Sequence, residues 1–171
     1  MWQASANSRK NDWCHRAGQY FRRGVPNHAI DEGRLTETGV AGDGWRHPQF
    51  HGIRKRAILL ITAEGVDELA AHGFPLFYGA LGENLTTCGL DRHSFQIGQR
   101  FRAGEAIVQL TDVRLPCGTL DVYGTTIQSA IHDARALAGD ATSPVWGMSG
   151  FYASVVRAGM MRPGDRITLL V

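Results

Sequence analysis

The sequence lacks a dominant charge. Its 171 residues include 18 Lys and Arg against 16 Asp and Glu, a formal net charge of +2. A balance this close to neutral does not support a nucleic-acid binder or a polybasic membrane anchor, because both depend on an excess of basic residues. With 43% hydrophobic and 20% charged residues, the composition is that of a folded globular chain of about one domain.

Long apolar runs are also missing. The longest, Ala57 to Ile61, falls far short of the roughly 18 residues that a membrane span needs. The N-terminal residues are polar and do not include the apolar core of a signal peptide. We therefore expect a cytoplasmic protein that is not embedded in a membrane.

Cysteine is sparse, and Cys14, Cys88 and Cys117 form an odd set without a C-x-x-C pair. Neither a disulfide framework nor a thiolate zinc site is expected from it. The glycines of residues 42–44 do not extend to G-x-G-x-x-G, and the P-loop and Gly-x-Ser-x-Gly motifs are absent. Nicotinamide, ATP and serine-hydrolase chemistry are therefore not indicated.

Two histidines, His47 and His51, have the spacing of metal ligands on one face of a helix. Pro48 lies between them and glycines flank them, so a helix is not expected there. Polar loop histidines are the simpler interpretation. The sequence leaves open whether His47, His51 or Asp43 lines a site.

Glycine, in contrast, is plentiful, and its 21 scattered residues predict many tight turns between short strands. The apolar patterns predict strands at residues 57–62, 84–87, 106–113, 152–158 and 166–171. They predict helices at residues 63–72, with Thr62 as N-cap and Gly73 as stop, and at residues 126–138. Residues 97–102 and 163–168 share a glycine turn followed by a polar residue, Arg and an apolar residue, which suggests two similar hairpin entries. We expect a mainly β domain at residues 19–171 behind a flexible N-terminal extension at residues 1–18.

Two segments carry polar groups suited to chemistry. In Gly79 to Thr87, two glycines allow close backbone approach or positive φ, and Glu83 with Asn84 suits the donor and acceptor edge of a heterocycle. The structural alternative is a turn in which Asn84 caps local backbone groups. The second segment, Arg114 to Cys117, follows a predicted strand directly. Arg114 is close enough in sequence to stabilise a Cys117 thiolate, although a free cysteine is more often a small core residue.

Together, Gly79-x-x-Gly82-Glu83-Asn84 and Arg114-x-Pro116-Cys117 resemble the MOSC family, named for the C-terminal domain of molybdenum cofactor sulfurases. The turn at residues 97–100, the early turns at residues 24–26 and 39–43, His51-Gly52 and the closing residues 147–152 and 163–165 also resemble the family. The chain departs from it in two places: Asn27 replaces a frequent Lys and Ile53 replaces a Gly. These departures put phosphate contacts near the N-terminal turn in doubt.

The resemblance implies a MOSC-type β-barrel with two or three short helices. It implies that Cys117 is the catalytic cysteine and ligates molybdenum in the molybdenum cofactor, a pterin that can carry a nucleotide. Soft sulfur donors suit such a metal. Gly82, Glu83 and Asn84 would meet the pterin, and Arg114, Arg54 and Lys55 would meet its phosphate. For residues 54–56, a solvated surface run is an equally good interpretation.

Standalone bacterial members of similar size include reductases of N-hydroxylated bases that draw electrons from a separate protein. The first hypothesis is accordingly a molybdenum-cofactor oxidoreductase reducing hydroxylaminopurine-like substrates. The second is a non-catalytic carrier of sulfur or cofactor that uses a Cys117 persulfide. The third is a binding module for a small anion, with Cys117 buried and inert. The oligomeric state is left open.

Overall fold

The computed structural model describes residues 14–16, 18–20, 26–43 and 53–171. Its strands are β1 (Cys14–Arg16), β2 (Gly18–Tyr20), β3 (His28–Ile30), β4 (Gly33–Thr36), β5 (Gly39–Val40), β6 (Ile58–Thr62), β7 (Leu85–Cys88), β8 (Arg100–Ala103), β9 (Ala106–Val113), β10 (Phe151–Arg157), β11 (Gly159–Met161) and β12 (Ile167–Leu170). Its α-helices are α1 (Ala63–Ala71), α2 (Ile127–Ile131) and α3 (Ala134–Leu137), and its 3₁₀ turns are η1 (Arg54–Arg56), η2 (Arg92–Ser94) and η3 (Gly118–Tyr123).

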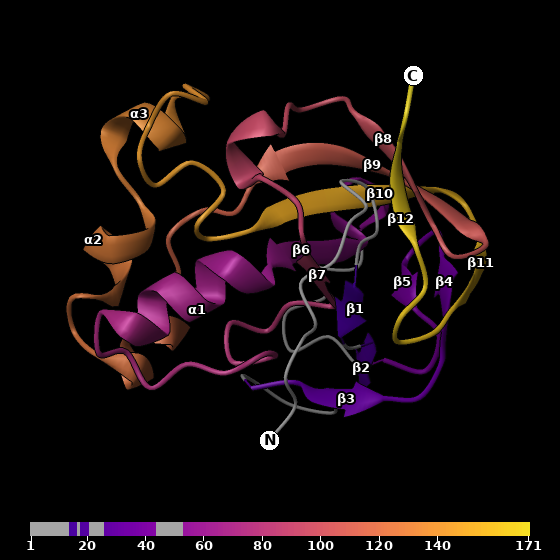
Figure 1. Cartoon of the computed structure of the whole chain (residues 1–171), viewed down its shortest axis with the longest axis horizontal. Coiled ribbons are helices and arrows are strands. Elements are labelled where there is room, and N and C mark those ends of the chain that lie inside the picture. Colours follow the sequence, from indigo (N-terminus) through magenta and orange to yellow (C-terminus); the bar gives the residue numbers. More distant parts are fainter. Residues whose placement is uncertain (1–13, 17, 21–25, 44–52) are drawn as a thin grey trace.

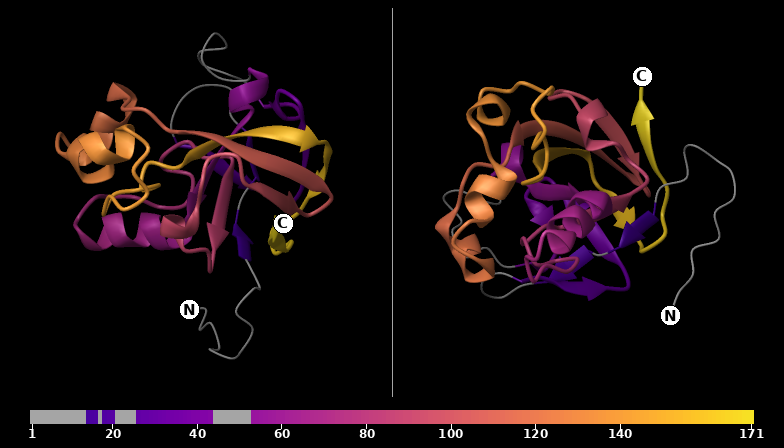
Figure 2. Two further views of the ribbon diagram at one scale, coloured as in Figure 1. Left: turned by 90° about the horizontal axis from the view of Figure 1, so that it is seen from above. Right: turned by 60° about the vertical axis from the view of Figure 1, so that its left-hand side comes forward.

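A seven-stranded sheet in the order β1-β7-β6-β10-β9-β8-β12 forms the body of the described structure. All its neighbours are antiparallel except β6 and β7, which are parallel. The connection between these two strands contains α1, as a parallel pair requires a long crossover. The sheet curls into a half-barrel, with the α-helices gathered at one end and β4, β5 and β11 at the other (Figures 1 and 2). The predicted mainly β fold is thus confirmed.

The strands predicted from apolar patterns are all present. Residues 106–113 form β9 as predicted, and β6, whose residues are all buried, occupies the strand predicted at 57–62. The two similar hairpin entries lead into β8 and β12, and these strands pair with each other. β11 was not predicted, because three residues carry too short a pattern to be read locally.

Helix α1 matches its prediction closely. The Thr62 hydroxyl accepts a hydrogen bond from the Gly65 N–H, and Gly73 follows the last turn with a φ of +93°. The side chains of Val66 and Leu69 are buried in an apolar cluster that also includes Leu81. N-cap, apolar face and glycine stop therefore all act as the sequence indicated.

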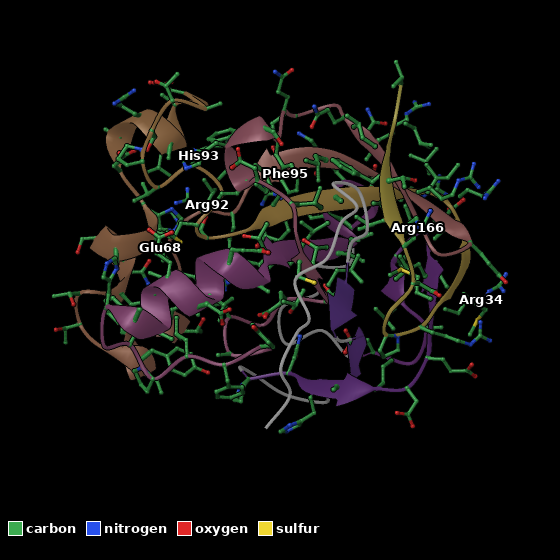
Figure 3. All side chains as sticks on the ribbon, viewed as in Figure 1. Arg34, Glu68, Arg92, His93, Phe95 and Arg166 are labelled. Atoms are coloured by element: carbon green, nitrogen blue, oxygen red, sulfur yellow. The ribbon has the colours of Figure 1, made fainter. Side chains whose placement is uncertain are left out.

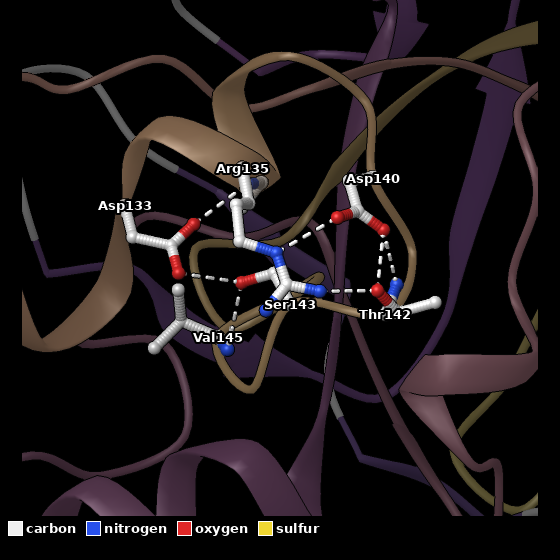
Figure 4. A network of polar contacts seen from close by, with 7 residues as sticks. Asp133, Arg135, Asp140, Thr142, Ser143 and Val145 are labelled. Carbon is white, nitrogen blue, oxygen red and sulfur yellow. Dashed lines mark hydrogen bonds and ion pairs between the residues drawn. The ribbon is translucent and has the colours of Figure 1, made fainter.

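The single helix predicted at residues 126–138 is wrong. The chain forms two short helices, α2 and α3, separated by His132 and Asp133 in extended conformations. The reason is a competing cap: the Asp133 carboxylate accepts a hydrogen bond from the Ala136 N–H at 2.6 Å and starts a new helix. Its second oxygen accepts from the Ser143 hydroxyl at 2.8 Å, within the network shown in Figure 4.

A second part of that network closes the loop that follows α3. Arg135 forms an ion pair with Asp140 at 2.8 Å and donates to the Thr142 hydroxyl. Asp140 accepts from the backbone N–H of Thr142 (Figure 4). The network thereby fixes the direction in which the chain leaves α2.

Aromatic side chains join the sheet to the adjoining loops. Phe95 packs edge-on against Phe101 and Phe151, with ring centroids 5.3 Å apart in both pairs. Trp146 packs against Phe151, and its indole N–H donates to the Phe95 carbonyl at 3.0 Å. These rings anchor the loop before β10 to the core.

Arg92 ties the same loop to α1 from the other side. Its guanidinium donates to the Pro144 and Trp146 carbonyls and pairs with Glu68 at 3.2 Å. Figure 3 shows Arg92 and Glu68 facing each other, with Phe95 following in the chain. The start of β10, which borders the site described below, is therefore held by both core and polar contacts.

The predicted N-terminal extension, residues 1–18, falls largely outside the described residues. Within it, β1 pairs with β7, so the described structure includes a strand ahead of the expected start near residue 19. In the described part of the chain, no helix has the length and apolarity to cross a membrane.

Candidate functional site

The first candidate segment, Arg114 to Cys117, leaves β9 beside the start of β10. The Arg114 N–H donates to the Gly150 carbonyl at 3.0 Å, and the Ser149 hydroxyl donates to the Arg114 carbonyl at 3.1 Å. Its backbone is thus fixed on both sides. The Arg114 side chain is only 6% exposed.

The second candidate segment, the turn from Gly79 to Glu83, meets the first through Arg114. The guanidinium Nη1 donates to the Leu81 carbonyl at 2.5 Å, although 33 residues separate the two. Gly79 and Gly82 have φ values of +100° and +77°, which confirms the positive φ that their spacing allowed. The structure therefore brings the two predicted segments together.

Glu83 lies fully buried beneath this turn. Its Oε1 accepts from the Gly79 N–H at 2.6 Å and from the Thr86 hydroxyl at 3.1 Å. Its Oε2 has no hydrogen-bond partner among the described residues. Burial raises the pKa of this carboxyl above its usual value, although the hydrogen bonds and the charge of Arg114 act in the opposite direction.

The turn is held from outside by Asn27, one of the two departures from the family pattern. The Asn27 side chain donates to the Glu83 carbonyl at 2.9 Å, and its backbone N–H donates to the Gly79 carbonyl at 2.9 Å. At this position the chain uses a buried amide to support its own turn.

Asn84 is engaged mainly with the protein itself. Its side-chain oxygen accepts from the Leu59 N–H at 2.8 Å, and its backbone N–H donates to the Leu59 carbonyl at 2.8 Å. Its amide nitrogen donates to Asp43 at 3.2 Å. These contacts are structural but not those of a local turn, because Leu59 lies 25 residues away in the chain; one amide hydrogen remains for a ligand.

Cys117 is half-buried at the start of η3. Its Sγ lies 2.9 Å from the Thr119 hydroxyl, and Gln128 of α2 holds the Cys117 backbone at both its N–H and its carbonyl. Burial favours the neutral thiol, yet the pKa of Cys117 falls below its usual value because the Thr119 hydrogen bonds and the Arg114 charge outweigh it. The site thus shifts the thiol toward the thiolate, the form that binds metals.

The basic run in η1 borders the site through Asp112, two residues before Arg114. Lys55 lies 3.4 Å and Arg56 lies 3.5 Å from the Asp112 carboxylate. Arg54 instead pairs with Glu37 at 2.5 Å, and its side chain is 81% exposed. Lys55 and Arg56 are therefore at the margin, and Arg54 belongs to the solvated surface.

Three aromatic or imidazole side chains near the site escaped the sequence reasoning. Tyr152 packs under the Arg56 guanidinium, 5.1 Å from ring centroid to carbon, and burial raises its pKa. Burial and then the charge of Glu83 raise the pKa of Tyr123. His132 is buried where α2 ends. No local motif marks these residues, since each reaches the site only through folding.

His47 and His51 lie outside the described residues.

The family model described as the MOSC domain matches residues 47–168, which contain both candidate segments. The chain belongs to the MOSC family. This family is associated with the molybdenum cofactor.

Two curated proteins are related to this MOSC domain in sequence. The uncharacterized protein YflK of Bacillus subtilis (strain 168) is 31% identical over 166 residues, which span 86% of the chain and 70% of YflK. Protein YiiM of Escherichia coli (strain K12) is 37% identical over 94 residues, which span 52% of the chain and 42% of YiiM. The matched segments thus leave part of each relative without a counterpart.

Solved structures share the MOSC architecture. YiiM from Escherichia coli superposes with a TM-score of 0.64 at 25% identity, covering 92% of this chain and 70% of the other. The YUAD protein from Bacillus subtilis gives 0.64 at 25% identity, covering 91% and 94%. YiiM from Geobacillus stearothermophilus gives 0.66 at 22% identity over 92% of this chain and 73% of its own, which shows the fold alone.

Proposed function

We propose that the protein is an oxidoreductase that binds the molybdenum cofactor and reduces N-hydroxylated compounds such as hydroxylaminopurine-like bases. The observation that carries the proposal is a half-buried Cys117, whose thiol pKa lies below its usual value, three residues after a buried Arg114. A soft thiolate suits molybdenum, and a guanidinium suits the phosphate of the pterin. The residues present therefore fit the cofactor.

The residues divide into those that would hold the metal and those that would hold the organic part. Cys117 would be the protein ligand of the metal. Arg114, with Lys55 at the margin, would contact the phosphate. Gly82 and the remaining amide hydrogen of Asn84 would face the ring, while Glu83, fully buried beneath the turn, would support them from below. Of the residues proposed to contact the phosphate, Arg54 is the least well supported, because it is exposed and paired with Glu37.

When bound, the cofactor would supply the site of two-electron transfer. The overall reaction consumes one N-hydroxylated base, two electrons and two protons, and yields the reduced base and water. The electrons would come from a separate electron-donor protein. The chain's own part would be to orient the substrate beside Cys117. The cytoplasm is the proposed location.

Metal analysis of a Cys117→Ser variant tests the proposal. The wild-type chain and the variant would be purified from a host that makes the cofactor and analysed for molybdenum and pterin. Cys88→Ser serves as the matched control, because Cys88 is a second half-buried cysteine on β7. We expect molybdenum in the wild type and the control, and its loss in Cys117→Ser.

Turnover completes the test. Reduction of a hydroxylaminopurine with an artificial electron donor should require Cys117 and not Cys88. A wild-type chain free of molybdenum would overturn the proposal. Sulfur added to Cys117 without any reductase turnover would replace it with the carrier function.

A further inference from the structure

Two cysteines from distant parts of the chain occupy opposite positions at the edge of the main sheet. The edge strand β1 lies beside β7 and pairs with it antiparallel (Figure 1). Its register sets Cys14 against Cys88 and His15 against Thr87. A slip by one residue would move Cys14 away from Cys88 and to the other face of the sheet. The observed register is therefore the one that matches the two cysteines.

Directly opposite positions of an antiparallel pair suit a disulfide. Such positions share one face of the sheet, and their Cα atoms lie about 4.5–5.5 Å apart in either hydrogen-bonding pattern. A disulfide requires Cα atoms about 4.4–6.8 Å apart. The register of β1 and β7 thus meets the backbone requirement for a bond between Cys14 and Cys88.

The backbone around Cys88 is held by its neighbours on the other side. Cys88 ends β7, and the residue before it, Thr87, is paired with Thr62 of β6. The N–H of the residue after it, Gly89, donates to the Glu64 carboxylate of α1 at 2.5 Å. Cys88 is half-buried, so part of the residue is exposed to a small reagent. One partner of the pair is thus both positioned and accessible.

The strand that carries Cys14 is short. β1 consists of three residues, and three residue pairs join it to β7. So short an edge strand makes few backbone hydrogen bonds, and these must offset the conformational entropy lost when the strand is ordered. A covalent bond between Cys14 and Cys88 would hold β1 in this register.

Strand β7 also supports the candidate site. The hydroxyl of Thr86 donates to the Glu83 carboxylate beneath the glycine turn at 3.1 Å, and Thr86 lies opposite Arg16 of β1. A bond between β1 and β7 would therefore fasten the N-terminal chain across the strand that holds this turn.

We propose that Cys14 and Cys88 form a reversible disulfide that locks β1 onto β7 under oxidising conditions. The pair is a redox-sensitive modification site, separate from Cys117. In a reducing compartment, disulfides of this kind are transient and typically serve catalysis or redox sensing. The proposal does not depend on the proposed function.

The oxidant is a low-molecular-weight disulfide, and the bond forms by two exchange steps. The thiolate of one cysteine attacks the small disulfide, forms a mixed disulfide and releases one small thiol. The thiolate of the other cysteine attacks the protein sulfur of the mixed disulfide, closes the Cys14–Cys88 bond and releases the second small thiol. The protein gives up two electrons and two protons, which the two small thiols carry away.

Redox titration of the full chain tests the pair. Reduced protein would be equilibrated with mixtures of reduced and oxidised glutathione, alkylated and digested, and its linked peptides identified by mass spectrometry without reduction. We expect a peptide that joins Cys14 to Cys88, with a fraction that rises with the share of oxidised glutathione. Cys117→Ser is the control that should keep this link, whereas Cys14→Ser and Cys88→Ser should lose it.

A shifted cysteine separates the effect of register from that of mere proximity. The double variant Cys14→Ser/His15→Cys carries its cysteine opposite Thr87, on the other face of the sheet. Its link to Cys88 should have an equilibrium constant about tenfold smaller than that of the native pair, or about 30 mV in reduction potential. In urea concentrations that unfold the chain, this difference should vanish, because the register is lost.

The linked wild type should also unfold at a higher urea concentration than the reduced chain, since the bond closes a long loop in the unfolded state. Absence of the Cys14–Cys88 peptide, or equal linkage by the shifted cysteine in the folded chain, would overturn the proposal. So would a disulfide that joins Cys88 to Cys117 or to a second copy instead, or a linked chain with an unchanged urea midpoint. Molybdenum analysis of the reduced protein tests the proposed function separately, so either proposal can fail without the other.

Discussion

Replacing Asn84 by Ala tests whether the residue serves mainly the fold or a ligand. The side-chain oxygen of Asn84 is the partner of the Leu59 N–H, and both residues are at least 95% buried. The paired contacts with Leu59 extend the parallel pairing of β6 and β7, which begins at Leu60 and Leu85. Alanine would leave a buried N–H without an acceptor at the start of the central strand.

The size of the effect follows from that unpaired donor. A buried backbone N–H left unsatisfied costs about 1–3 kcal/mol, and the lost contact with Asp43 adds a smaller amount. We therefore expect the free energy of unfolding to fall by about 2 kcal/mol. In a chain of this length, that corresponds to a drop of roughly 4–8 °C in the melting temperature.

Urea unfolding followed by circular dichroism measures this change. The midpoint should fall with an unchanged m-value, since the variant exposes the same surface on unfolding. Thr87→Val is the matched control, because its hydroxyl makes only a long contact of 3.3 Å with the Ile61 carbonyl. A variant Asn84→Ala as stable as the wild type, yet unable to bind the cofactor, would refute the reasoning and make Asn84 a ligand-binding residue.

Two further predictions concern the site and its support. Thr119→Val removes the hydroxyl 2.9 Å from the Cys117 sulfur, so the pKa of Cys117 should rise. The pH profile of Cys117 alkylation by iodoacetamide, quantified by peptide mass spectrometry, should then shift to higher pH. An unshifted profile would show that Thr119 does not stabilise the thiolate. Arg92→Met leaves the Pro144 and Trp146 carbonyls without their donor. It should lower the free energy of unfolding, measured by urea denaturation, by about 3 kcal/mol. Glu68→Gln alters only the more exposed partner of the ion pair and should lower it by less than about 1 kcal/mol.

Local sequence patterns were sufficient to predict much of the fold and to find each of the two candidate segments separately. β6, β9 and α1 follow from apolar runs, a cap and a glycine stop, all of which act within a few residues. The contact between Arg114 and Leu81 spans 33 residues and depends on how the strands pair, so no pattern in either segment contains it. The sequence marked both segments but not the bond that joins them.

The break at His132 illustrates a different reason for failure. Apolar residues at helical spacing continue across residues 126–138, and a reading based on periodicity alone joins them. Asp133 competes as an N-cap, and its partner Ser143 lies ten residues further along, so the strength of that cap is set by the loop after α3. The break between α2 and α3, which the helix prediction missed, also places the buried His132 imidazole, whose ring nitrogens have no partner among the described residues.

Arg114 would let a nearly neutral chain bind the phosphate of the proposed cofactor. With a net charge of +2, the field of the whole protein is weak, so recognition must be local. Because Arg114 is buried, its charge is little screened. At His132 it adds to the larger effect of burial, and the pKa falls to about 4; at Cys117 burial acts against it, but the Thr119 hydrogen bonds together with Arg114 still lower the pKa. Those two changes have opposite consequences for charge: the thiol is pushed toward its anionic form, suited to a metal, while the imidazole is kept neutral, suited to donating one hydrogen bond. One buried cation thus acts in the same direction on the pKa of the proposed metal ligand and on that of a buried imidazole.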